Sequence, residues 1–129
     1  KTKSVGWWKK LLDHKFSQYI RQKYAVNGVT ECVTCGAKHP WKNMQNGHYI
    51  ARNHMSTRYS ERNNHPQCIG CNMFKNGNMD EYALFLIKTY GEGILEDLQK
   101  EKQKIRQIRI PEYQELIKLY EDKIKALND

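Results

Sequence analysis

The chain has 129 residues, a length that fits one domain, and its 22 Lys and Arg residues outnumber 14 Asp and Glu residues to give a net charge of +8. No apolar run approaches the roughly 20 residues that a membrane span needs, and nothing resembles a signal peptide, so we expect a cytoplasmic protein with no membrane partner. So basic a chain favours an anionic partner, most often nucleic acid, over a protein with no polyanion partner.

The first predicted element is an amphipathic helix over residues 4–24. Its apolar residues recur at helical spacing and are Trp8, Leu11, Leu12, Phe16, Tyr19, Ile20 and Tyr24. Farther along, MQNGHYIA at 44–51 predicts a strand, with Asn46 and His48 on the same face because side chains alternate along a strand. Residues 52–67 are polar and follow no period, so we expect irregular structure there.

A short helix is predicted from Cys71 onward, interrupted by the sequence KNGN at 75–78. The next segment, DEYALFLIKTY at 80–90, has the spacing of an amphipathic helix. Asp80 is suited to cap its first turn and Gly91 to end it.

The rest of the chain is predicted to be helical. Residues 94–109 are highly charged, and Pro111 suits the first turn of a last helix. One face of that helix carries an apolar stripe that favours core or dimer packing: Tyr113, Leu116, Ile117, Tyr120, Ile124 and Leu127.

Four cysteines form two C-x2-C pairs, Cys32 with Cys35 and Cys68 with Cys71, and no cysteine is left over. Two such pairs supply the four thiolates of a tetrahedral Zn²⁺ site, which is closed and therefore structural. Disulfides are disfavoured in the cytoplasm, and a thioredoxin-like redox pair needs a βαβ pattern that is missing here. Zinc would also stabilise a chain whose hydrophobic core must be small.

The segment between the two cysteine pairs holds four of the five histidines, His39, His48, His54 and His65. A single histidine is most often a surface or satisfied polar residue, so the pattern matters more than the count. That pattern is H-x14-N-x8-N, formed by His48, Asn63 and Asn72, with Asn72 directly after the last cysteine.

In this pattern the chain resembles the HNH, or ββα-metal, nucleases that carry a zinc ribbon. The resemblance implies that His48 is the general base, Asn63 braces the hairpin and Asn72 binds the catalytic metal. Asn76, four residues on, is expected one helical turn from Asn72 as a second ligand or phosphate contact.

Several stretches in order resemble one branch, the NinG/Rap recombination nucleases of phages: FSQYIRQKY, CVTCG, NGHYIAR, TRYSERNNHPQC and CNMFKNGN. The similarity covers roughly residues 10–98 and implies cutting of branched DNA, such as Holliday junctions and strand-invasion intermediates, with a divalent metal. A phage-encoded enzyme of this kind would work in the host cytoplasm. Resolving a symmetric junction takes two cuts, so a homodimer is expected on symmetry grounds.

One position departs from the wider HNH pattern. Gly47 stands where many of these enzymes have an Asp or His metal ligand before the base. The ligands that remain are Asn72, with Asn76 or His65 as a further candidate, phosphate oxygens and water. Neutral oxygen ligands and several waters suit Mg²⁺ or Mn²⁺ better than a second zinc. The alternative assignment makes His48 a metal ligand and His65 the base.

Basic residues near the predicted site are expected to bind DNA: Arg52, Arg58, Arg62 and Lys75. A guanidinium binds phosphate through two parallel hydrogen bonds. Arg52 is a preferred clamp because it lies four residues from His48, and Arg58 because it belongs to the TRY part of the matched stretch. The other reading is that these side chains are solvated surface charges.

Together these features predict an α+β fold in a single domain over 1–129. It comprises an N-terminal helix at 4–24, a zinc-ribbon HNH core at 28–79 and a C-terminal helical extension at 80–129. The predicted function is a metal-dependent DNA endonuclease. Two alternatives remain: a non-catalytic zinc-containing nucleic-acid-binding module, and a zinc-stabilised protein-interaction domain that uses the C-terminal helices.

Overall fold

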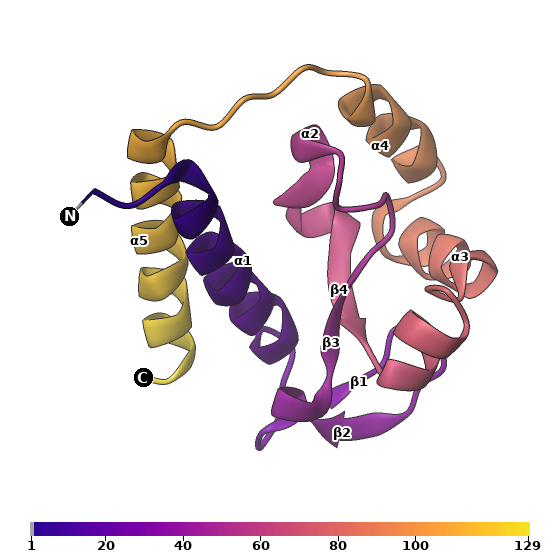
Figure 1. Cartoon of the computed structure of the whole chain (residues 1–129). Helices are drawn as coiled ribbons and strands as arrows, with labels where there is room; N and C mark the ends of the chain where they lie inside the picture. Colours follow the sequence, from indigo (N-terminus) through magenta and orange to yellow (C-terminus); the bar gives the residue numbers. More distant parts are fainter. Residues whose placement is uncertain (1) are drawn as a thin grey trace.

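The structure, a computed structural model, describes residues 2–129 and has a mixed α+β architecture (Figure 1). Its helices are α1 (Val5–Gln22), α2 (Met55–Arg58), α3 (Met79–Tyr90), α4 (Ile94–Lys102) and α5 (Ile110–Leu127). The strands are β1 (Val29–Glu31), β2 (Lys38–Pro40), β3 (Gln45–His48) and β4 (Asn64–Gln67). Three single turns complete it, the 3₁₀ turns η1 (Trp41–Asn43) and η2 (Glu61–Asn63) and the π-helical turn η3 (Gly70–Phe74). No helix in the described part of the chain is both long and apolar enough to cross a membrane.

The two longest helices, α1 and α5, run side by side in the same direction (Figure 1). Their apolar faces form one core cluster, as the helical spacing predicted: Leu12, Phe16, Tyr19 and Ile20 from α1, and Tyr113, Ile117, Tyr120 and Ile124 from α5. The side chain of Ser4 caps α1 by accepting a hydrogen bond from the Trp7 amide at 3.1 Å. Leu127, in the last turn of α5, lies outside this core and is 39% exposed.

The four strands form two antiparallel hairpins, of which the β3–β4 hairpin lies between the α1–α5 pair and helices α3 and α4 (Figure 1). β1 pairs with β2, and β3 pairs with β4 in a register that sets Gly47 opposite His65 and His48 opposite Asn64. The expectation of irregular structure over 52–67 was therefore wrong for most of this range, because the short helix α2, the turn η2 and strand β4 form there. The β4 sequence, NHPQ, lacks the alternation of polar and apolar residues by which a strand is recognised, and all four of its residues are buried in the structure.

Helices α3 and α4 pack beside β4 around a second core cluster made of Ile50, Tyr82, Leu86, Ile94 and Leu98. Gly91 ends α3 as predicted, with φ at +100°. The N-cap of α3 is Asn78 rather than Asp80, because the helix begins one residue earlier and Asp80 lies in its first turn.

The predicted helix over 94–109 forms only as far as Lys102. The remaining residues cross in an extended path from α4 to the start of α5 (Figure 1). This crossing is what allows α5 to return to α1 on the other side of the molecule, and Ile108 reaches the α1–α5 core from it.

Candidate active site and metal centre

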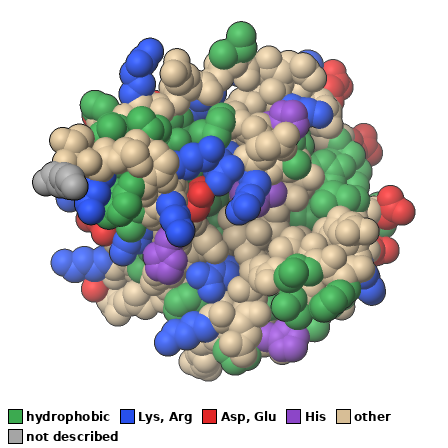
Figure 2. All heavy atoms as spheres, viewed as in Figure 1, with side chains coloured by type: hydrophobic (Ala, Val, Ile, Leu, Met, Phe, Trp, Pro, Cys, Tyr) green, Lys and Arg blue, Asp and Glu red, His purple; other side chains and the backbone are tan. Residues whose placement is uncertain are grey.

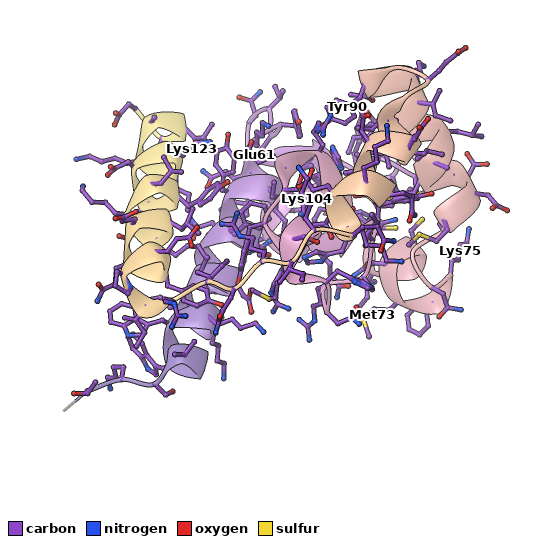
Figure 3. All side chains as sticks on the ribbon, turned by 90° about the horizontal axis from the view of Figure 1, so that it is seen from above. Glu61, Met73, Lys75, Tyr90, Lys104 and Lys123 are labelled. Carbon is purple, nitrogen blue, oxygen red and sulfur yellow. The ribbon has the colours of Figure 1, made fainter. Side chains whose placement is uncertain are left out.

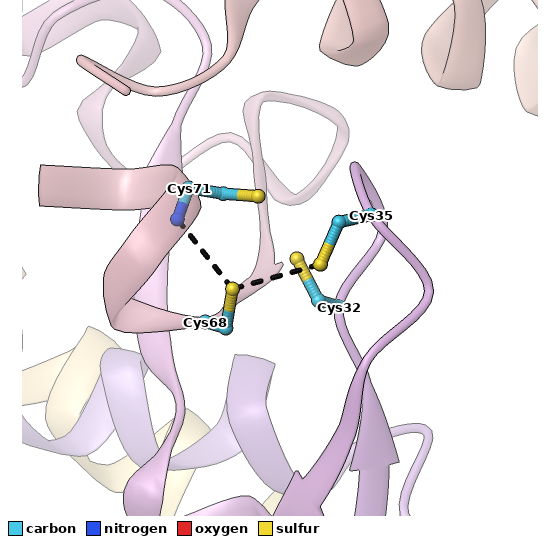
Figure 4. A group of neighbouring side chains, drawn as sticks. All are labelled: Cys32, Cys35, Cys68 and Cys71. Atoms are coloured by element: carbon cyan, nitrogen blue, oxygen red, sulfur yellow. Dashed lines mark hydrogen bonds between the residues drawn. The ribbon is translucent and has the colours of Figure 1, made fainter. Parts of the chain in front are cut away.

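The four cysteines converge in space, although the two pairs lie far apart in the sequence (Figure 4). All four thiol sulfurs lie within 4.8 Å of one another, and the Cys35 and Cys68 sulfurs are 3.7 Å apart. A tetrahedron with Zn–S bonds of about 2.3 Å has sulfurs about 3.8 Å apart, so the donor set fits a structural zinc ion. All four are free cysteines, as a thiolate site requires.

The surroundings of the cysteine cluster supply hydrogen bonds to sulfur. The amide of Cys71 donates to the Cys68 sulfur at 3.5 Å, and the Asn78 side-chain amide donates to the Cys71 sulfur at 3.6 Å. Such donors orient thiolates and offset the negative charge of a four-thiolate site. The cluster joins the β1–β2 hairpin to η3, and a closed site of this kind contributes to folding rather than to chemistry.

Because η3 is held in this way, its residue Asn72 faces strand β3. The side-chain amide of Asn72 donates to the side-chain oxygen of Gln45 at 2.7 Å. Asn72 and His48 then line the same pocket, of about 480 Å³, which we call the His48 pocket. Its wall is formed by Asp13, Phe16, Ser17, Arg21, Met44, Gln45, Asn46, His48, Arg52, Arg58, Tyr59 and Asn72.

Of the residues that the sequence indicated, the pocket unites His48, Asn72, Arg52 and Arg58. Figure 2 shows Lys and Arg side chains gathered on this face of the molecule, around histidine and acidic side chains. The other predicted site residues lie outside its wall: Asn63, His65, Arg62, Lys75 and Asn76.

His48 is the last residue of β3, and its imidazole is partly buried in the pocket wall. Burial, followed by the positive charges of Arg58 and Arg52, lowers the pKa of His48 to about 4. The imidazole is therefore neutral across the physiological range and has a lone pair available to accept a proton.

Gly47 has a structural explanation that the sequence did not reveal. A Cβ atom at this position would lie 2.0 Å from the side-chain oxygen of Gln67 on the paired strand. Gln67 is fully buried, and its amide nitrogen donates to the carbonyl of Gly77 and to the hydroxyl of Thr34. Only glycine fits beside this anchored side chain, so an acidic metal ligand at position 47 is sterically excluded.

Asn63 is completely buried and binds the backbone just after His48. Its side-chain oxygen accepts from the Ile50 amide at 2.8 Å, while its side-chain nitrogen donates to the carbonyls of Ile50 at 3.0 Å and Thr57 at 3.3 Å. Its own carbonyl accepts from the Tyr49 amide. This geometry is that of a brace, which fixes the path of the chain beyond His48.

Replacing Asn63 with alanine should lower the free energy of unfolding by about 2–4 kcal/mol, because the buried amide and carbonyl of Ile50 lose their partners. Urea denaturation of the zinc-loaded protein measures this change. Asn53→Ala is the matched control. Asn53 is exposed in the same segment between the two cysteine pairs, so this substitution should change the free energy of unfolding little. If the two substitutions lowered the free energy of unfolding equally, the structural role of the Asn63 hydrogen bonds would be contradicted.

His65 is fully buried in β4, and both of its ring nitrogens are engaged. The Nδ1 atom lies 3.0 Å from the Tyr82 hydroxyl and Nε2 lies 2.7 Å from the Tyr90 hydroxyl. The Tyr82 hydroxyl donates to the Gly47 carbonyl at 2.7 Å, so it accepts from Nδ1–H, and Nε2 accepts from Tyr90. With no free lone pair and no exposed surface, His65 is placed for a structural role rather than as the base.

Arg58 belongs to the floor of the pocket rather than to its surface. Its guanidinium forms two hydrogen bonds to the Asp13 carboxylate, at 3.0 and 2.6 Å, and a third to the Arg52 carbonyl at 2.7 Å. The Tyr59 hydroxyl also donates to Asp13, at 2.6 Å. Arg58 was expected to bind phosphate, but the guanidinium N–H groups that would do so already bind the Asp13 carboxylate.

Asp13 is a pocket residue that the sequence did not indicate. It comes from α1, outside the segment of the HNH pattern, and it is the only acidic residue in the pocket wall. The only signal in the sequence was its place on the polar face of an amphipathic helix, which many surface residues share. Arg21 enters the wall from the same helix, where its guanidinium lies over the Trp41 ring.

The other predicted DNA contacts differ in exposure and position. Arg52 is exposed at the rim of the pocket, whereas Arg62 forms ion pairs with Asp97 at 3.8 Å and Glu101 at 3.7 Å. Lys75 and Asn76 are exposed beyond the end of η3. Asn76 has φ at +51° and so does not continue the helix, which removes the basis for placing it one turn from Asn72.

Comparison with known proteins adds the family context. The family model described as "Bacteriophage Lambda NinG protein" matches residues 1–129. Similar curated proteins are Protein ninG of Salmonella phage P22 and of Escherichia phage lambda, each 27% identical over 98% of this chain, and that of Escherichia phage 933W, 26% identical over the same share. The chain spans about three fifths of the length of these relatives (61%, 60% and 61%). No solved structure gave a significant match.

Proposed function

Because this chain belongs to the NinG family of bacteriophage proteins, we propose that it is a metal-dependent DNA endonuclease of the HNH type. The observation that carries this proposal is the meeting of His48 and Asn72 in one pocket, where Asn72 on η3 donates a hydrogen bond to Gln45 on the same strand as His48. A neutral imidazole can accept the proton of an attacking water, an amide oxygen can hold a metal ion, and the exposed guanidinium of Arg52 can hold a phosphate.

In this mechanism His48 is the general base. Its lone pair takes a proton from the attacking water, and its low pKa keeps it unprotonated before the reaction. Arg52 lies exposed at the rim, where its guanidinium can hold a phosphate by two hydrogen bonds. Asn63 holds the chain after His48, so the imidazole keeps its direction toward the pocket.

The catalytic Mg²⁺ or Mn²⁺ fits the donors near Asn72. The Asn72 side chain donates to Gln45 through its nitrogen, which leaves its carbonyl oxygen for a cation. Asn46 also lines the pocket, and its buried side-chain oxygen has no hydrogen-bond donor among the described residues. Oxygen donors of this type suit a hard cation that retains water. When bound, the metal would stabilise negative charge on the phosphate and on the leaving oxygen.

Branched DNA is the substrate class that we propose from the family resemblance, with a homodimer making paired cuts. The test is cleavage of a labelled four-way junction against a linear duplex of the same arms, with Mg²⁺ and then Mn²⁺. Selective cutting of the junction is expected, and equal cutting of both DNAs would keep the nuclease but remove the branch selectivity. Binding without cutting would favour the non-catalytic zinc module, which the absence of a free carboxylate in the pocket also suits.

The pKa of His48 gives a pH prediction. A group with a pKa of about 4 stays neutral as the pH falls from about 7.5 to 5.5, so kcat/KM should be nearly level over this range. An ordinary histidine with a pKa near 6.5 would instead lose about tenfold. Initial cleavage rates in buffers of constant ionic strength test this, with zinc content checked at each pH. A tenfold fall toward the lower pH would contradict the assignment.

A further inference from the structure

Three exposed apolar side chains lie on or next to the turn that carries Asn72. Ile69, Met73 and Phe74 are 50%, 56% and 80% exposed, and we call this group the η3 tip. Another run of exposed apolar residues, Tyr24, Val26 and Val29, lines no part of the His48 pocket, whereas the η3 tip flanks the pocket residue Asn72. Three within six residues form a patch, and exposed patches mark binding surfaces.

The η3 tip is fixed to the His48 pocket by Gln45. The side chain of Gln45 donates to the Met73 sulfur at 3.5 Å and accepts from Asn72 at 2.7 Å. The tip is shaped by a π-type hydrogen bond from the Lys75 amide to the Gly70 carbonyl at 3.0 Å. Met73 and Lys75 extend outward at the edge of the molecule (Figure 3), and hydrophobic side chains stand over η3 on the same face as the basic cluster (Figure 2).

Building on the nuclease function above, we propose that the η3 tip is a stacking surface for an unstacked nucleobase next to the phosphate held in the His48 pocket. Phe74 provides the aromatic face, and the neighbouring exposed Lys75 provides a charge for the backbone. Bases in a continuous duplex cover one another, so only DNA with unpaired or splayed bases offers a free face to Phe74.

A nucleobase fits the tip better than a second copy of the chain. Stable protein interfaces use about 20–30 residues a side, whereas the tip has three apolar residues bordered by Lys75. The tip is also linked through Gln45 to a pocket wall that holds three arginines against one acidic residue, Asp13, so the wall keeps positive charge to attract a polyanion beside the tip.

The test measures DNA binding by the zinc-loaded full chain without Mg²⁺ or Mn²⁺. The probes are a duplex with a short bulge that contains 2-aminopurine and the same duplex without the bulge. Phe74→Ala should weaken binding to the bulged DNA about tenfold while leaving duplex binding within about twofold, as expected for loss of one base–aromatic stack. Phe74→Trp should bind as wild type does, because it keeps the aromatic face. Leu84→Ala, an exposed apolar change on α3, is the matched control and should change neither affinity.

Each outcome decides between explanations. If Phe74→Ala keeps the wild-type preference for the bulge, the stacking surface is wrong although the nuclease function stands. If the substitution instead converts a dimer to a monomer in sedimentation without changing that preference, the tip is an interface between copies. If the wild-type protein binds neither DNA, both the stacking surface and the nuclease function are overturned.

Discussion

Replacing His48 with alanine should lower the rate of phosphodiester cleavage by about 10²- to 10⁴-fold, the usual contribution of a general base. The substitution removes the only histidine of the pocket wall, and His65 cannot replace it because both of its nitrogens are bound to tyrosine hydroxyls. DNA affinity should change little, because the neutral imidazole contributes no charge to the basic pocket. Single-turnover cleavage with saturating enzyme separates this loss of rate from any change in binding.

The matched control is His14→Ala, which removes an exposed histidine from α1 without touching the pocket wall. His14→Ala should cleave at the wild-type rate. A His48→Ala protein that cleaves at this same rate would show that the imidazole is not the base. A His48→Ala protein that loses DNA binding and zinc together would instead indicate a folding defect, so zinc content and circular dichroism accompany the rates.

Local patterns in the sequence predicted the parts of the fold that follow a period or a fixed spacing. The C-x2-C pairs indicated the cysteine cluster, and the apolar stripes of α1 and α5 indicated their buried faces. The motif that pairs His48 with Asn72 also indicated two residues that line one pocket, where the Asn72 side chain is hydrogen-bonded to Gln45 of β3. Each of these signals depends on residues that are close in sequence or that share one metal.

What escaped the sequence depends on tertiary contacts of polar residues. β4 has buried Asn64, His65 and Gln67, and polar residues give no sign that they will be buried. Arg58 was expected to bind DNA from its place in the matched stretch, and its partner in the structure, Asp13, lies 45 positions earlier on a helix outside the motif. Nothing local to either residue predicts that pair.

The reason for Gly47 also lies outside the motif. In the sequence it marks a missing ligand, whereas in the structure it makes room for the Gln67 side chain from the neighbouring strand. The same β4 strand carries His65, which is hydrogen-bonded to the Tyr82 hydroxyl. That hydroxyl in turn donates to the Gly47 carbonyl. A buried polar layer therefore supports the strand that ends in His48, and the Gln67 side chain of this layer occupies the space that a side chain at position 47 would need.

Removal of zinc should unfold the segment from β1 to η3. Zinc binding contributes about 10–16 kcal/mol in small zinc-finger peptides, which is comparable to or larger than the 5–15 kcal/mol by which a typical protein is stable. The apolar cluster at the cysteines contains only Cys32, Met44 and Cys71, with Cys68 packed against it, so little other burial holds this hairpin to η3. The α1–α5 core is a separate cluster and should keep more of its structure.

Amide hydrogen exchange before and after chelation measures this directly. Protection should be lost first over residues 28–79, and one equivalent of Zn²⁺ per chain should restore it. Cys71→Ser, which removes a buried ligand, should reproduce the chelated state, whereas Ser60→Ala in the same segment should not. Because the cluster also positions Asn72, cleavage should disappear together with protection and return with zinc. Full protection after verified loss of zinc would mean that packing alone holds η3 against β3, and that the four thiols are not the support of the His48 pocket.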